Sequence, residues 1–260
     1  MTVGFVGLGE MGLPMAANLV ASGRDVVGFD TDAAAVARAQ EAGVRSGDVA
    51  DTDVAIVMVR TLPQVEAVVE SLHGPRIVVV MSTADPDGIE RVAERATVPV
   101  LDAPVSGGVR GAEARTLSIM VSGDRAAFDE VRPLLDELGS TVRYLGERPG
   151  LGQAAKLANQ LMMTVALAGT LEGLALAERY GLGDEAVLEV VGAGTGSSWV
   201  LQHWDWMRSL WEGYEPGNAL DVLLKDMRAL FRETEAQGHA SPVAEAAYAR
   251  LLAHWQPFIS

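Results

Sequence analysis

Cysteine is absent from this sequence of 260 residues, and lysine occurs only twice. Without cysteine the chain has no disulfide framework and no thiolate nucleophile. The four histidines are scattered, with no pair spaced by four residues, and neither a Gly-x-Ser-x-Gly nor a phosphate-loop Gly-Lys-Ser/Thr pattern occurs. These absences argue against metal, serine-hydrolase and P-loop chemistry.

Positive charge is also scarce, with 20 basic against 35 acidic residues, a net charge of -15 and no basic run. Nucleic acids and anionic membranes bind clustered positive charge, so we expect neither as a partner. The most apolar stretch, residues 157–171, is shorter than the ~20 residues of a membrane span and contains polar side chains. The chain begins on a strand-like segment instead of a signal peptide, which predicts a cytoplasmic protein.

A glycine-rich motif is present at the start of the chain. Residues 2–6 predict a short apolar strand, the sequence GLGEMG follows at once, and a helical pattern continues from there. This is the context of a dinucleotide-binding fingerprint, in which the glycines allow a tight turn, close approach of a pyrophosphate and close helix packing. The predicted cofactor contacts here are Gly7, Leu8, Gly9, Glu10, Met11 and Gly12.

The second predicted strand, residues 25–30, ends in Asp30, eighteen residues after Gly12. A carboxylate at this place can accept hydrogen bonds from the adenosine ribose. Asp32 follows, and no arginine lies between Asp30 and Arg38, so a 2'-phosphate would meet uncompensated negative charge. The pattern favours NAD over NADP, and the alternative is a solvated aspartate at the end of a strand.

Apolar strand patterns alternate with helical patterns through the first half of the chain. This alternation predicts a doubly wound, mostly parallel sheet of the α/β class in a domain of residues 1–148. The second domain, residues 149–260, is predicted to be all helical and built on one long helix. The further predicted strands are residues 54–59, 77–81, 98–101, 117–121 and 142–145, and the helices are 63–71, 87–96, 126–138, 151–180, 184–191, 197–211, 219–237 and 241–255.

The long helix begins in the sequence GLGQAAKLANQ at residues 150–160. Lys156, Asn159 and Gln160 are spaced by three and four residues, which places them on one helix face. Eighteen of the twenty basic residues are arginine, so a lysine here is informative. A partly desolvated lysine can exchange a proton, whereas arginine stays charged, so we predict that Lys156 is a general acid or base. The alternative is a solvated surface lysine.

Four stretches together resemble the 3-hydroxyacid dehydrogenase family, which includes 3-hydroxyisobutyrate dehydrogenase and is related to 6-phosphogluconate dehydrogenase. They are residues 7–19, 102–120, 150–160 and 225–226. The resemblance covers nearly the whole chain and implies a Rossmann domain followed by a helical substrate and oligomerisation domain. It also implies an NAD(P)-dependent 3-hydroxyacid dehydrogenase, and we expect a homodimer or homotetramer.

The resemblance assigns roles to individual residues. It implies that Ser106, Gly107 and Gly108 bind substrate, and a cluster of backbone amides there suits a carboxylate; the alternative is an ordinary glycine-rich turn. It implies that Lys156 is the general acid/base and that Lys225 lies near the cofactor. Asn159 and Gln160 are expected to contact substrate, and Ser82 and Thr83 follow a strand at the sheet edge where the nicotinamide should lie.

Three features depart from the family pattern. Gln160 replaces a usual asparagine, Arg115 replaces a usual glycine, and the C-terminus is shorter than in most members. The first of these departures bears on substrate geometry, and the short C-terminus bears on assembly. Four tryptophans, at 199, 204, 206 and 211, are expected in helix packing more than in a pocket wall.

The sequence favours transfer of a hydride between NAD and a small 3-hydroxyacid or its semialdehyde. An imine reductase-like enzyme is the closest rival, but that related group usually replaces the catalytic lysine and favours NADPH. A non-catalytic NAD-binding protein is a second alternative, and it would need neither Lys156 nor Ser106.

Overall fold

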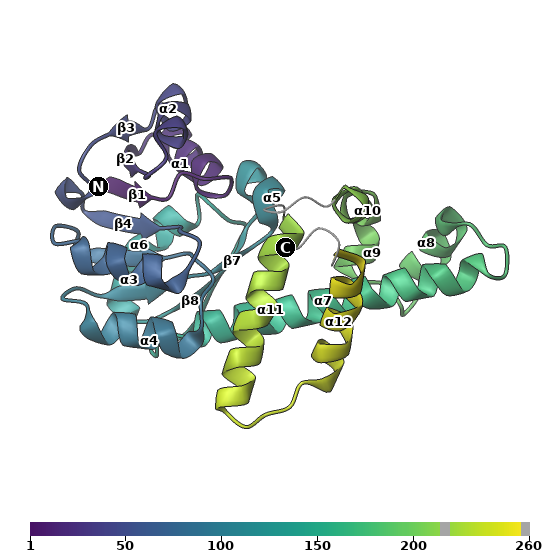
Figure 1. Ribbon diagram of the computed structural model, residues 1–260. Coiled ribbons are helices and arrows are strands. Elements are labelled where there is room, and N and C mark those ends of the chain that lie inside the picture. The colour runs from purple at the N-terminus through teal and green to yellow at the C-terminus, as the bar shows by residue number, and fades with distance from the viewer. Residues whose placement is uncertain (214–218, 256–260) are drawn as a thin grey trace. The chain divides into compact units, whose positions relative to one another are not determined.

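The computed structural model describes residues 1–213 and 219–255, which form two compact units, residues 1–156 and residues 157–260 (Figure 1). The division falls inside the long helix α7, Leu151–Glu178, and not before it. The first turn and a half of this helix therefore belongs to the first unit.

The first unit contains a nine-stranded sheet in the order β3-β2-β1-β4-β5-β6-β8-β7, with β9 paired to β8. Pairing is parallel from β3 to β6 and antiparallel where β8 meets β6 and β7. The order 3-2-1-4-5-6 is that of a Rossmann sheet, so the predicted α/β class is confirmed. The strands are β1 (Thr2–Val6), β2 (Asp25–Phe29), β3 (Arg45–Ser46), β4 (Val54–Val57), β5 (Ile77–Val80), β6 (Val100–Asp102), β7 (Val105–Ser106), β8 (Ser118–Ser122) and β9 (Thr141–Gly146).

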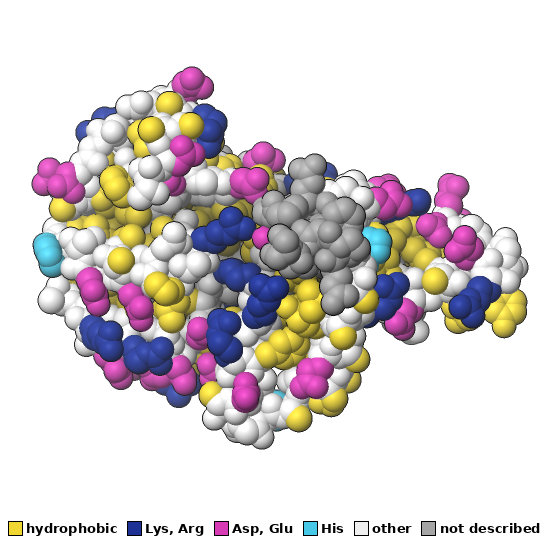
Figure 2. Space-filling view, in the orientation of Figure 1, with side chains coloured by type: hydrophobic (Ala, Val, Ile, Leu, Met, Phe, Trp, Pro, Cys, Tyr) yellow, Lys and Arg dark blue, Asp and Glu magenta, His cyan; other side chains and the backbone are white. Residues whose placement is uncertain are grey.

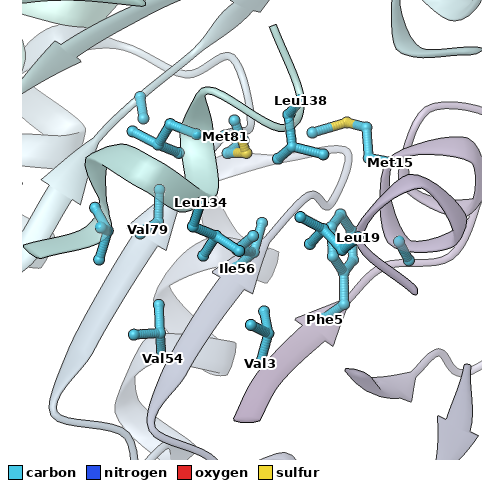
Figure 3. Close-up of a cluster of buried hydrophobic side chains, with 14 of the residues drawn as sticks. Val3, Phe5, Met15, Leu19, Val54, Ile56, Val79, Met81, Leu134 and Leu138 are labelled. Atoms are coloured by element: carbon cyan, nitrogen blue, oxygen red, sulfur yellow. The ribbon is translucent and has the colours of Figure 1, made fainter. Parts of the chain in front are cut away.

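Helices cover both faces of this sheet (Figure 1). Successive strand residues point to opposite faces, so Phe5 and Ile56 join one core, while Val6 and Val57 join the other. Figure 3 shows the first core, where Met15 and Leu19 of α1 meet the strand side chains. The helices of this unit are α1 (Gly12–Ala21), α2 (Ala33–Glu41), α3 (Leu62–Ser71), α4 (Pro86–Arg95), α5 (Gly108–Ala114) and α6 (Arg125–Leu135), with a 3-10 turn at Val49–Asp51.

Short polar sequences set where these helices begin. Asp32 and Asp124 accept hydrogen bonds from backbone N–H groups in the first turns of α2 and α6. Thr61 and Gln64 form a capping box at the start of α3. On the surface near α3 and α4, acidic and basic side chains lie side by side (Figure 2). The starts of α2, α3 and α6 therefore follow from local sequence.

The second unit is helical throughout its described residues. The predicted helix over residues 197–211 is wrong in one respect, because it is broken at His203 into α9 and α10. The His203 backbone leaves the helical region, and its ring Nδ1 lies 2.9 Å from the Trp199 carbonyl oxygen. Beyond α7, the helices are α8 (Asp184–Gly192), α9 (Trp199–Gln202), α10 (Trp204–Glu212), α11 (Ala219–Ala236) and α12 (Pro242–Trp255).

The core of the second unit lies along one side of α7. Leu167 and Leu174 of α7 pack there with Trp204 and Trp211, so these two tryptophans belong to the core, whereas Trp199 is about half exposed. By length and composition α7 could cross a membrane, with a mean hydropathy of 1.4. Its polar side chains at 153, 156, 160 and 164 are buried within the protein, which is typical of a core helix.

Candidate active site

The loop between β1 and α1 has little room for side chains at two of its three motif glycines. Gly7 has a φ of +96°, and a Cβ atom there would lie 2.2 Å from the Met58 carbonyl oxygen. A Cβ atom on Gly12 would lie 1.9 Å from the Gly7 carbonyl oxygen. Both positions therefore require glycine for the loop and helix to pack as they do.

Gly9 differs, because a Cβ atom there would meet no described atom within 4 Å beyond its chain neighbours. Gly9 is exposed, and among the described residues no side chain caps the N-terminus of α1. The open space and the uncapped helix end fit a dinucleotide pyrophosphate. Glu10 and Met11 complete this loop, Glu10 exposed and Met11 half-buried.

Asp30 fixes the glycine-rich loop to the end of β2. Its Oδ2 accepts a hydrogen bond from the Leu8 N–H at 2.7 Å, and its Oδ1 accepts one from the Asp32 N–H at 2.9 Å. The Leu8 side chain is in the core, so Leu8 is held by its backbone N–H on one side and by its packed side chain on the other. Asp32 caps α2 and lies 4.0 Å from Arg38, so its negative charge is partly compensated.

Ser82 and Thr83 follow β5. Ser82 is buried, and its Oγ accepts a hydrogen bond from the Val59 N–H at 2.9 Å, which ties the loop after β5 to the end of β4. Thr83 is partly exposed. Ser82 is therefore committed to contacts within the protein and offers no accessible side chain to a cofactor, unlike the partly exposed Thr83.

Asp102, for which no sequence motif predicts a role, is the centre of a buried hydrogen-bond network. Its Oδ2 accepts from the Ser122 hydroxyl and from the N–H groups of Gly150 and Gln153, each at 3.0 Å. Its Oδ1 accepts from Gln153 Nε2 at 2.7 Å. The backbone donors belong to the start of α7, where N–H groups have no partner within the helix. Asp102 therefore caps α7 from a distant strand.

Burial raises the pKa of the Asp102 carboxyl from 3.8 to about 6, against the opposing hydrogen bonds from Gln153, Ser122 and Gly150. Because folding raises this pKa, the stabilisation it brings is complete below the unfolded value and is lost as pH rises through about 6. The quantity to compare is the free energy of unfolding of the wild type minus that of Asp102→Asn. We expect this difference to be about 1 kcal/mol larger at pH 5 than at pH 7. Urea unfolding of both proteins at both pH values measures this, and the same difference at both would contradict it.

Ser106 ends β7, and the two glycines after it start α5. Gly107 has a φ of +132° and Gly108 a φ of +61°, so both adopt backbone conformations that favour glycine. Ser106 and Gly108 are partly exposed and Gly107 is exposed. Arg115, at the other end of α5, is left-handed with a φ of 58°, which explains why a glycine would suit its position.

Lys156 lies one helical turn after Gln153 and is only 7% exposed. This burial contradicts the alternative of a solvated surface lysine.

In the second unit, a separate chain of polar contacts joins α7 to α11. Asn159 Nδ2 donates to Gln160 Oε1 at 3.0 Å, and Gln160 Nε2 donates to the buried Asp226 carboxylate at 2.7 Å. Lys225 Nζ lies 3.1 Å from the other oxygen of Asp226. The extra methylene of Gln160 relative to asparagine thus serves a contact within the protein, so Gln160 is largely committed to Asp226.

Two family models match the chain along most of its length. The NAD binding domain of 6-phosphogluconate dehydrogenase matches residues 2–146, and the NAD-binding domain of NADP-dependent 3-hydroxyisobutyrate dehydrogenase matches residues 150–255. A 3-hydroxyisobutyrate dehydrogenase of Pseudomonas aeruginosa is 34% identical over 263 residues, which cover 93% of this chain and 88% of that protein. The chain belongs to the 3-hydroxyacid dehydrogenase family.

Similar solved structures agree with that assignment. The 3-hydroxyisobutyrate dehydrogenase of Mycobacterium tuberculosis, described with L-serine, has a TM-score of 0.83 and 31% identity, covering 97% of this chain and 94% of its own. A second structure, described as Psf3 in complex with NADP+ and 2-OPP, has a TM-score of 0.84 and 26% identity, with 98% and 94% coverage. The protein is thus an oxidoreductase of the 3-hydroxyacid dehydrogenase family with nicotinamide-cofactor-binding domains.

The fold also occurs in the rival class of enzymes. An imine reductase of Streptomyces aurantiacus has a TM-score of 0.71 at 20% identity, covering 97% of this chain and 94% of its own. At this identity the likeness shows a shared fold only.

Proposed function

We propose that this protein transfers a hydride between NAD and a small 3-hydroxyacid or its semialdehyde, with Lys156 as general acid/base. The observation that carries the proposal is the burial of a lysine, one of only two in the chain, one turn after the capped start of α7. In the direction of oxidation, Lys156 accepts the proton of the substrate hydroxyl as the hydride leaves the alcohol carbon. In reduction it returns that proton to the carbonyl oxygen.

The nicotinamide cofactor, when bound, supplies the two-electron acceptor or donor for this reaction. The open backbone at Gly9 and the uncapped start of α1 would hold its pyrophosphate. Ser106, Gly107 and Gly108 offer a hydroxyl and backbone amides to the substrate carboxylate.

A substrate panel tests this function. Absorbance of the reduced cofactor is followed with 3-hydroxyacids, their semialdehydes, the matching 3-hydroxy amides and cyclic imines. We expect turnover of the acids or semialdehydes, with the amides poorer by about tenfold or more because they lose charge-assisted hydrogen bonds. Preferential turnover of cyclic imines would favour an imine reductase, and cofactor binding without any turnover would favour a non-catalytic protein.

Coenzyme preference follows from the acidic end of β2. Asp30 and Asp32 follow β2, where the dinucleotide fingerprint expects the adenosine ribose, and Arg38 Nη2, 4.0 Å from Asp32 Oδ2, offsets only part of their negative charge. We expect kcat/KM with NAD to exceed that with NADP by about ten- to a hundredfold. The two values are measured side by side at one ionic strength, and equal or better turnover with NADP would reverse the preference.

Self-association is proposed through the second unit. Met162, Leu176 and Val190 are 69%, 59% and 72% exposed, and Figure 2 shows further hydrophobic side chains over α11 and α12. Exposed apolar side chains in such number are typical of an interface between copies. We expect sedimentation velocity to give the mass of a homodimer or homotetramer at micromolar concentration. A monomer under these conditions would contradict this proposal alone.

A further inference from the structure

Gln153 lies in the first turn of α7 and is fully buried, so its side chain cannot touch a substrate or cofactor. Its Oε1 accepts from the Ala84 N–H at 2.9 Å, and its Nε2 donates to the Ser82 carbonyl oxygen at 3.0 Å. The same Nε2 donates to Asp102 Oδ1 at 2.7 Å. One amide therefore joins the loop after β5, the end of β6 and the start of α7.

The orientation of this amide is determined by its partners. The Ala84 N–H can only donate, and the Ser82 carbonyl can only accept, so the oxygen of Gln153 must face Ala84 and its nitrogen must face Ser82. That leaves the second amide hydrogen for the Asp102 carboxylate. The three partners need a side chain that can accept one hydrogen bond and donate two, and that is long enough to reach Ala84, Ser82 and Asp102. Glutamine meets both requirements.

The helix start is held to a third strand as well. Ser122, the last residue of β8, donates to Asp102 and accepts from the Gly152 N–H at 3.1 Å. A Cβ atom on Gly152 would lie 2.5 Å from the Met120 carbonyl oxygen and 2.8 Å from Asp102 Oδ2, so the helix backbone sits directly against the sheet edge. Every one of these residues belongs to the first unit, as does Lys156.

We propose that Gln153, acting with Asp102, is a positioning residue that fixes the place of Lys156 relative to the loop of residues 82–84. Lys156 follows Gln153 by three residues, about 4.5 Å along the helix axis, so a shift of the first turn moves it directly. Burial of the Asp102 carboxylate costs stability, and the hydrogen bonds of the network offset that cost and leave little net gain. The network therefore defines a geometry more than it stabilises the fold. The inference rests on the proposed role of Lys156.

The test compares Gln153→Met with a matched control, Thr52→Val. Thr52 is also buried, and its hydroxyl donates to the carbonyl oxygens of Val49 at 2.7 Å and Val54 at 3.4 Å, but it precedes β4 at the amino ends of the strands. For Gln153→Met we expect kcat to fall by about 10- to 100-fold, with KM little changed and NADH bound at full stoichiometry. Thr52→Val should lose thermal stability and keep its kcat.

Hydrogen exchange gives a second readout that needs no turnover. Amides at residues 154–158 should exchange about tenfold faster or more in Gln153→Met and unchanged in Thr52→Val. Should Gln153→Met fail to fold, Ser122→Ala removes one donor to Asp102 and should act in the same direction with a smaller loss of kcat.

The outcomes separate this inference from the proposed function. Unchanged exchange, or a kcat no lower than that of Thr52→Val, overturns the positioning role. A fall in activity that only matches a fall in NADH-binding stoichiometry also overturns it, because that reports unfolded protein. If the wild type turns over no hydroxyacid, the proposed function fails, and unchanged or faster exchange still decides whether Gln153 fixes the helix start.

Discussion

We expect Lys156→Arg to lower kcat by about 10²- to 10⁴-fold while NAD binding stays near its wild-type strength. Arginine keeps the positive charge but cannot give up its proton usefully, and Lys156→Met keeps the apolar stem while losing both charge and proton. Both variants should bind NAD, because the glycine-rich loop at Gly9 is formed between β1 and α1, and Lys156 belongs to neither element. Steady-state kinetics and a fluorescence titration with NADH measure the two effects separately.

Lys225→Arg is the matched control, since it changes the only other lysine in the chain. Lys225 is partly exposed and pairs with Asp226, and an arginine can preserve that ion pair. Because the family resemblance implies that Lys225 lies near the cofactor, Lys225→Arg should mainly raise KM. It should leave more turnover than Lys156→Arg. Near-normal turnover in Lys156→Arg would remove the acid-base role and leave Lys156 as an electrostatic anchor.

The second large effect concerns two glycines that lie three residues apart and have opposite surroundings. Gly9→Ala should leave the free energy of unfolding within about 0.5 kcal/mol of wild type and weaken NAD binding by about tenfold or more, because its methyl group enters the open space in which we propose that the pyrophosphate binds. Gly12→Ala should destabilise the protein by about 1–3 kcal/mol, because its methyl group meets the Gly7 carbonyl oxygen.

Urea unfolding and NADH titration of the two variants test this pair. The contrast between them is the informative result. If Gly9→Ala unfolds as easily as Gly12→Ala, or binds NADH normally, Gly9 does not lie against the cofactor.

Most of the first unit could be predicted from sequence because its long elements repeat a simple pattern. Apolar strands such as Val54–Val57 and Ile77–Val80 alternate with amphipathic helices, and this pattern alone indicates a parallel sheet. The two-residue strands β3 and β7 could not be found, since two residues carry no periodicity. The break at His203 was also missed, because neither proline nor glycine marks it.

The candidate site was only partly visible for a related reason. Lys156 can be predicted as a site residue because lysine is rare in this chain, and Asp30 can be predicted because it ends a strand. Asp102 and Gln153 are 51 residues apart in sequence, and only folding brings them together. The single local sign of Asp102 was a carboxylate directly after the apolar residues of β6, a place where a solvated aspartate is equally common.

Isotope transfer tests hydride chemistry on a hydroxyacid most directly. The wild-type protein is incubated with NAD and 3-hydroxyacids that carry deuterium at the alcohol carbon, and the reduced cofactor is analysed by mass spectrometry. We predict that the deuterium appears in the reduced cofactor and that the semialdehyde is the other product. Reduced cofactor without deuterium, or deuterium retained in every hydroxyacid while NAD binds normally, would contradict the proposed reaction.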